Sequence, residues 1–174
     1  MMPCKNNKWL FVLAIYCLFF SGCGYRLVGT GNALPQNIKT IHIPVFENTS
    51  SQPEIHRQLT SFVLQSFISD GRLKIANKDE ADLILDATLS YYNLRNVAFS
   101  SQDLVSDIII EIEIDLKVID RVKNKILIKK ELEQQWDYKS TPDLADTETA
   151  RLAALDKAYI DFGNRLVSLI IDQF

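Results

Sequence analysis

Apolar and polar residues alternate most strictly over residues 106–120. A period of two puts successive side chains on opposite faces of a strand, so this strand is predicted to have one buried face and one wet face. The apolar face comprises Ile108, Ile110, Ile112, Ile114, Leu116 and Val118. The wet face carries Glu111, Glu113, Asp115 and Lys117.

The same period recurs on both sides of this strand. Residues 81–94 and 125–138 alternate in the same way, and a tight turn over 121–125 with Asn124 as its left-handed residue precedes the last segment. Three strands are therefore predicted to form an antiparallel meander. Acids on one strand are expected to face lysines on the next, which would stabilise the pairing modestly. The polar residues 95–105 are predicted to form a loop.

Apolar residues change to helical spacing over residues 53–69, which predicts an amphipathic helix. Ser51 and Glu54 stand at the spacing of a capping box at its start. Gly71 follows the last turn and predicts a left-handed stop.

A second, longer helix is predicted over residues 144–172. Thr141 followed by Pro142 has the pattern of an N-cap and a first helical residue. Gly163 lies inside this helix, where glycine costs about 1 kcal/mol relative to alanine. It marks either close packing or no special feature.

Shorter strands complete the pattern at residues 38–46 and 72–77. Pro44 cannot donate a ladder hydrogen bond, so the first of them is predicted to lie at a sheet edge or to be bulged. Each long strand has one apolar face and each helix one apolar stripe. The predicted fold class is α+β, with two helices packed on one face of a mostly antiparallel four-stranded sheet as a two-layer sandwich.

The N-terminal segment has the organisation of an export signal. Lys5 and Lys8 precede the apolar run 9–20, which is followed by Ser-Gly and then Cys23. The run is too short for a resident membrane helix, which needs about 20 residues. A cysteine after small residues resembles the lipobox of bacterial lipoproteins, so residues 1–22 are predicted to be a cleaved signal peptide and Cys23 to carry lipid. The alternative is an ordinary signal peptide with Cys23 as a bystander.

The remaining chain divides into a flexible tether, residues 23–37, and a single domain, residues 38–174. Loss of Lys5 and Lys8 with the signal changes the formal net charge from −3 to −5. An acidic domain lacks the basic face of a nucleic-acid-binding protein, so no nucleic-acid partner is predicted. Without a thiol beyond Cys23, the domain must be stabilised by its hydrophobic core.

Residues that carry chemistry are few. His42 and His56 do not have metal-ligand spacing on one element, and no motif of a hydrolase or a phosphate-binding loop occurs. Two of Glu111, Glu113 and Asp115 have the residue types of an acid–base pair, although alternation alone also produces this row. We therefore predict no enzyme activity, no catalytic residue, no metal and no cofactor other than the covalent lipid on Cys23.

Three short motifs resemble one family. They are residues 23–27 (Cys-Gly-Tyr-Arg-Leu), residues 41–48 (Ile-His-Ile-Pro-Val-Phe-Glu-Asn), and Ala81-Asp82 before a long strand. Together with the order of the elements they resemble the LptE family of lipopolysaccharide-assembly lipoproteins. The resemblance implies two helices on a four-stranded sheet and a lipid-anchored protein at the periplasmic face of the outer membrane. It also implies a plug that sits inside the LptD β-barrel, helps the barrel to fold and binds lipopolysaccharide.

Two candidate sites follow from the meander. The predicted loops 95–105 and 139–143 lie at the same end of the sheet and carry Arg95 and Lys139, which suit the phosphates of lipopolysaccharide. The alternative is that both are solvated loop charges. The wet face, with Glu111, Glu113, Asp115 and Lys117, is the candidate barrel contact, because barrel lumens are polar.

Two competing classes remain. An accessory or pilot lipoprotein of another envelope transport complex would share the signal and the small α+β domain. A periplasmic hydrolase would need a clustered catalytic site, and the sequence shows none.

Overall fold

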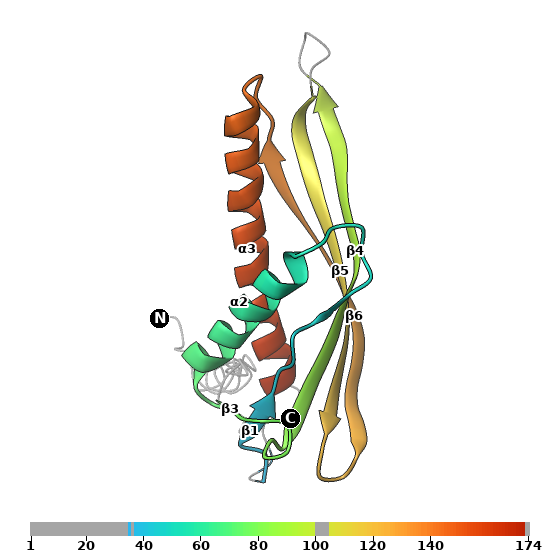
Figure 1. The fold of residues 1–174 in the computed structure, drawn as a ribbon, viewed down its shortest axis with the longest axis vertical. Coiled ribbons are helices and arrows are strands. Elements are labelled where there is room, and N and C mark those ends of the chain that lie inside the picture. The colour runs from blue at the N-terminus through green and yellow to red at the C-terminus, as the bar shows by residue number, and fades with distance from the viewer. Residues whose placement is uncertain (1–34, 36, 100–104, 173–174) are drawn as a thin grey trace, which may run out of the picture. The chain divides into compact units, whose positions relative to one another are not determined.

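The computed structural model describes residues 35, 37–99 and 105–172. The predicted signal peptide, Cys23 and most of the predicted tether lie outside the described residues. The described chain forms strands β1 (Thr40–His42) and β2 (Glu47–Asn48), helix α2 (Ile55–Asp70), strands β3 (Lys74–Ile75), β4 (Leu83–Phe99), β5 (Val105–Asp120) and β6 (Lys125–Lys139), and helix α3 (Leu144–Ile171) (Figure 1).

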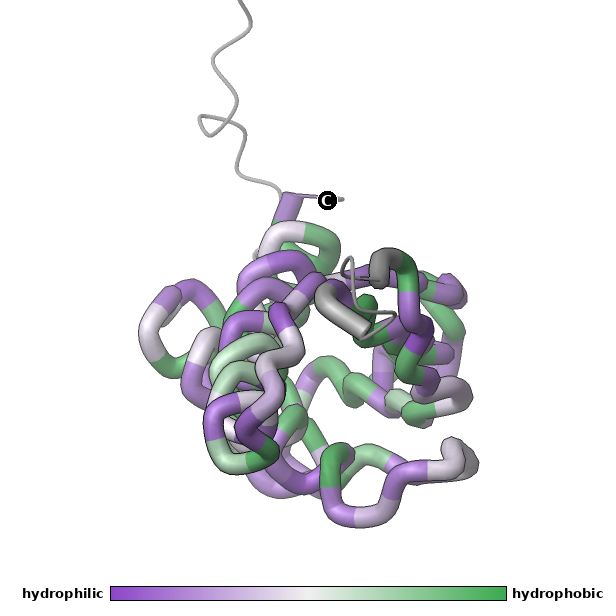
Figure 2. Tube along the Cα trace, turned by 90° about the horizontal axis from the view of Figure 1, so that it is seen from above, coloured by the Kyte–Doolittle hydropathy of each residue, from purple (hydrophilic) through white to green (hydrophobic). Residues whose placement is uncertain are grey.

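The strands form one mixed sheet in the order β3-β1-β4-β5-β6, and β2 also pairs with β4. Strand β1 is parallel to β3 and β4, whereas β4, β5 and β6 are successively antiparallel. Seen from above, both helices lie on the same side of the sheet (Figure 2). The α+β class and the two helices on one face are therefore confirmed.

The prediction of four mostly antiparallel strands is only partly right. The observed sheet has six strands in the described chain, and it is mixed. Helix α2 lies between β1 and β3 along the chain, and a crossover of this kind returns the chain to the same end of the sheet, which makes the strands parallel. The prediction of an edge position for β1 is also wrong. The strand lies between β3 and β4, and it ends at His42, before Pro44.

The meander is longer than predicted. Strand β4 runs to Phe99 and β5 begins at Val105, so residues 95–99 and 105 of the predicted loop 95–105 are strand, and residues 100–104 lie outside the described range. Residues 95–99 are two polar residues followed by three apolar ones, which gave no alternation to detect, but their backbone pairs with β5, with Arg95 opposite Ile109. The turn before β6 contains Asn124 with a φ of 49°, as predicted.

The N-caps of both helices differ from the prediction, although α3 begins at Leu144 as predicted. The N-cap of α2 is Glu54 with a φ of 71° and no side-chain cap, and the hydroxyl of Ser51 instead donates to the Tyr92 carbonyl at 3.1 Å. The N-cap of α3 is Asp143, whose carboxylate accepts from the Ala145 amide at 2.7 Å, rather than Thr141.

The predicted end of α2 is confirmed. Gly71 has a φ of 73° and its amide donates to the Phe67 carbonyl at 3.1 Å. A positive φ of this size is strained for residues with a Cβ, so glycine suits the position.

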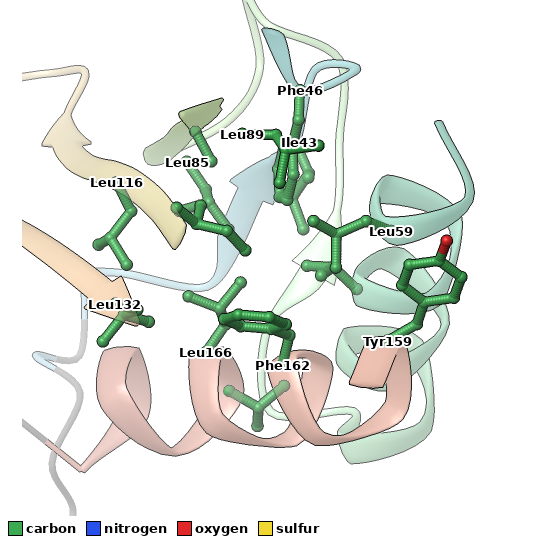
Figure 3. Close-up of a cluster of buried hydrophobic side chains, with 14 of the residues drawn as sticks. Ile43, Phe46, Leu59, Leu85, Leu89, Leu116, Leu132, Tyr159, Phe162 and Leu166 are labelled. Carbon is green, nitrogen blue, oxygen red and sulfur yellow. The ribbon is translucent and has the colours of Figure 1, made fainter. Parts of the chain in front are cut away.

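The core lies between the sheet and the two helices. Leucines of β4, β5 and β6 meet Leu59 of α2 and the side chains of Tyr159, Phe162 and Leu166 of α3 (Figure 3). The predicted apolar face of β5 is buried from Ile110 to Val118, with each apolar side chain at most 1% exposed. The opposite face of the meander points away from the helices, and we call it the outer face.

Candidate functional site

The structure places the two predicted cations on one end of the sheet and on its outer face. Arg95 lies within β4, opposite Ile109, whose other neighbour is Asp137 of β6. Lys139 is the last residue of β6, opposite Asp107. Two strand spacings and two residues separate the cations, which corresponds to about 12 Å between their Cα atoms. Both belong to strands rather than to the predicted loops.

The Arg95 guanidinium is anchored. Its Nε donates to Glu111 Oε1 at 2.7 Å, and Asn93 donates to the other carboxylate oxygen at 3.2 Å. These two hydrogen bonds hold the pKa of Glu111 below its usual value, and the one from Arg95 has the larger effect. The Arg95 side chain is still 47% exposed, so one edge of the guanidinium faces solvent.

The Lys139 side chain has a weaker carboxylate contact than Arg95. Its ammonium lies 3.9 Å from Asp107 Oδ1, and its side chain is 82% exposed. An exposed pair at this distance contributes little to stability. The ammonium is therefore accessible to an anionic ligand.

The predicted barrel-contact residues lie on the outer face of β5. Glu111 and Glu113 are partly exposed, and Asp115 and Lys117 are exposed. Alternation placed them correctly, because their neighbours on β5 are all core residues. The acidic residues of the outer face are Asp86, Asp107, Glu111, Glu113, Asp115, Glu131, Glu133 and Asp137. The basic residues are fewer: Arg95, Lys117, Lys129 and Lys139.

The expectation that acids face lysines across the meander is confirmed for Asp86 opposite Lys117 and for Asp107 opposite Lys139, but it is wrong for three rows between β5 and β6. The register puts Glu113 opposite Glu133 and Asp115 opposite Glu131, which we call the acid rows. The next row is Lys117 opposite Lys129, which we call the lysine row. Like charges placed directly opposite each other destabilise a strand pair.

A hollow of about 870 Å³ lies over this part of the outer face. Its floor includes Asp115, Lys117, Lys129 and Glu131, and the segment around Val45 forms one side. The Val45 side chain is 63% exposed. The hollow therefore combines charges of both signs with an apolar margin.

On the helix side of the sheet, Arg151 is bound to neighbouring side chains. Arg151 Nη2 lies 2.6 Å from Glu148 Oε1, and its Nη1 donates to the Tyr92 hydroxyl at 3.5 Å. The pKa of Arg151 is raised, mainly by the hydrogen bond to Glu148. Nearby, burial raises the pKa of Tyr159 to about 12, so its phenol stays protonated. Arg151 therefore stabilises α3 and the sheet rather than offering a free charge.

Asp82 is a structural residue whose role the sequence pattern did not predict. Its Oδ2 accepts from the Lys39 amide at 2.8 Å, the Thr40 amide at 3.0 Å and the Thr40 hydroxyl at 2.9 Å. The Asp82 amide lies 2.9 Å from the same Thr40 hydroxyl oxygen, to which it donates. This carboxylate fastens the start of β1 to the start of β4. The available signal was the Ala81-Asp82 motif itself.

The histidines make ordinary contacts. His42 Nδ1 lies 3.0 Å from the Ala76 carbonyl, and His56 Nδ1 lies 3.3 Å from the Asn48 amide nitrogen. Within the described ranges there is no cluster of histidine, cysteine and carboxylate side chains suited to a metal ion. Helices of the same ranges include none with the length and apolarity needed to cross a membrane.

Solved structures share this fold. Protein XCC0632 from Xanthomonas campestris superposes with a TM-score of 0.56 at 16% identity, covering 82% of this chain and 91% of that one. The rare lipoprotein B from Shewanella oneidensis gives 0.54 at 14% identity, with 74% and 92% covered. Lipoprotein B from Nitrosomonas europaea gives 0.52 at 20% identity, with 86% and 89% covered.

Sequence comparison identifies the family. No protein with a curated description matches the chain. The family model of LptE, described as lipopolysaccharide-assembly, matches residues 38–170, which is almost the whole of the described domain. The chain therefore belongs to the LptE family.

Proposed function

We propose that this protein is a non-catalytic outer-membrane lipoprotein, anchored at the periplasmic face through lipid on Cys23. It plugs the LptD β-barrel, assists its assembly and binds lipopolysaccharide on its way to the cell surface. The observation that carries this proposal is the family match over residues 38–170. The polar outer face supports it, since the lumen wall that a plug would meet is polar as well.

A pull-down of the tagged, full-length chain from detergent-solubilised envelope tests the assembly role. We expect mass spectrometry to identify one large outer-membrane barrel protein in near-equal amount. Recovery of an inner-membrane transporter subunit, or of no barrel, would instead assign the chain to another envelope transport complex.

Within this function, Arg95 and Lys139 are our proposed lipopolysaccharide contact. They share an end and a face of the sheet, and both are exposed although each has a carboxylate neighbour. A phosphate can bind the exposed part of the Arg95 guanidinium while Glu111 stays in place, and it can displace the weak contact of Lys139 with Asp107. Arginine engages phosphate as a fork and lysine as a point charge.

Replacing both Arg95 and Lys139 by alanine should weaken lipopolysaccharide binding about tenfold, since removing one charged interaction at an exposed site costs on the order of 0.5–1 kcal/mol. Titration of purified protein with lipopolysaccharide measures the affinity. The control replaces Lys157 and Arg165, two exposed cations of α3, and removes the same charge elsewhere. If the Arg95 and Lys139 variant binds as well as the parent, these residues are not the contact.

A further inference from the structure

We propose that the outer face docks against a protein surface with a matching order of charge: a basic band over the acid rows, followed by an acidic band over the lysine row. This inference rests on the proposed function, in which that surface is the lumen wall of the barrel. It adds which charges the lumen wall must present where it contacts the outer face.

The argument begins with the register. Glu113 with Glu133, Asp115 with Glu131, and Lys117 with Lys129 are three consecutive like-charged pairs. Directly opposed Cβ atoms in an antiparallel pair lie about 5 Å apart. Successive rows on one face are two residues, or about 7 Å, apart along the strand. The two bands therefore have a defined order and spacing on the molecule.

None of the six side chains of these rows forms an ion pair within the described residues, although Asp86 of β4 lies opposite Lys117. Glu113 accepts from the Ser90 hydroxyl at 3.2 Å and Glu133 from the Gln135 amide at 3.5 Å, and both donors are uncharged. Across the residues that the structure describes, none of the six side chains has an oppositely charged atom within 4.0 Å. Glu111, one row away, contrasts with them because Arg95 pairs with it at 2.7 Å.

Such rows destabilise the isolated domain, and a partner of the right sign would convert each into attractive contacts. Cations over two adjacent carboxylate rows and carboxylates over the lysine row would fix both the orientation and the register of docking, which is the usual role of complementary charge at an interface. The hollow at the same place, with exposed Val45 at its side, leaves room for side chains of the partner.

The charge balance selects the kind of partner. Acids outnumber cations on the outer face, so a second copy of the chain would bring a surface of the same sign. Lipopolysaccharide is anionic and would be repelled by the acid rows in the same way. A protein surface that is basic over most of this area, with one acidic band, is the occupant that fits.

The test exchanges the lysine row with the adjacent acid row without changing the net charge. One variant carries Asp115→Lys, Glu131→Lys, Lys117→Glu and Lys129→Glu. The control carries Asp146→Lys, Asp156→Lys, Lys157→Glu and Arg165→Glu, all at exposed positions of α3. We expect the first variant to recover about tenfold less barrel protein than the parent in the envelope pull-down, and the control to recover as much as the parent.

A second variant guards against misfolding. Glu133→Lys gives Glu113 a partner of opposite charge, so its melting temperature should equal or exceed that of the parent while barrel recovery falls. If folded Glu133→Lys recovers the barrel as the parent does, the proposed docking surface is wrong and the proposed function stands. If the parent itself recovers no barrel, the proposed function fails and this inference fails with it.

Discussion

Replacing Gly163 by valine should lower the free energy of unfolding by about 2–4 kcal/mol, because the two helices approach closely at this residue. A Cβ at position 163 would collide with the hydroxyl of Ser66 in α2, and it would lie 3.0 Å from Ser66 Cβ and 3.3 Å from the Phe62 carbonyl oxygen. The hydroxyl of Ser66 is itself bonded to that carbonyl at 3.0 Å. Valine would force the helices apart. Urea unfolding followed by circular dichroism measures the loss.

Smaller changes at the same position separate crowding from helix propensity. Gly163→Ala should change stability by no more than about 1 kcal/mol, since the gain in helix propensity offsets part of the collision. Adding Ser66→Gly should relieve the collision, so the two substitutions should couple favourably in a double-mutant cycle. Lys157→Val, on an exposed part of α3, serves as the control. A valine variant as stable as the parent would show that the helix pair yields without cost.

Faces of the long strands could be predicted from sequence, but their register could not. Alternation fixes which side of β5 is buried, because a slip of one residue would expose the whole apolar set. A slip of two residues preserves the faces and changes only the pairs. Glu113 therefore lies opposite Glu133 rather than a lysine, and the pattern held no information on this choice.

The pairing of short strands and the helix caps were also not predicted from the sequence. Strand β3 has two residues, Lys74–Ile75, too few to show a period, and its pairing with β1 follows from the crossover through α2. Helix caps failed for a different reason. The Ser51 hydroxyl donates to the Tyr92 carbonyl of β4, and the Thr141 hydroxyl donates to the carbonyl of Asp143, which is the N-cap itself.

For the candidate site, the sequence predicted where the residues lie on the sheet, but it did not predict which side chains they contact. The meander correctly put Arg95 and Lys139 at one end of the sheet, since strand direction alone determines this. Their carboxylate neighbours, Glu111 and Asp107, depended on the register and were not predicted. The acid rows were missed for the same reason, although every residue in them lies on the predicted face.

Asp82→Ala should lower the free energy of unfolding by about 2–3 kcal/mol at neutral pH, because it leaves two backbone amides and a hydroxyl without their acceptor. Denaturant unfolding at pH 7 measures the effect. Asp82→Asn keeps one acceptor oxygen and loses the charge, so its loss should be smaller. Asp79→Ala, in the exposed turn just before, controls for removal of an acid and should be nearly neutral.

The effect of Asp82→Ala should also depend on pH. Hydrogen bonds hold the pKa of Asp82 below its usual value. The bond from the Lys39 amide has the largest effect, and those from Thr40 add to it. A carboxyl whose pKa is lower in the folded state stabilises the fold above its unfolded pKa of about 4, and this contribution is lost as the pH falls through the folded pKa. The difference in stability between the parent and Asp82→Ala should therefore be largest at neutral pH and should shrink below about pH 4. A difference that is the same at pH 3 and pH 7 would mean that the Asp82 charge does not fasten β1 to β4.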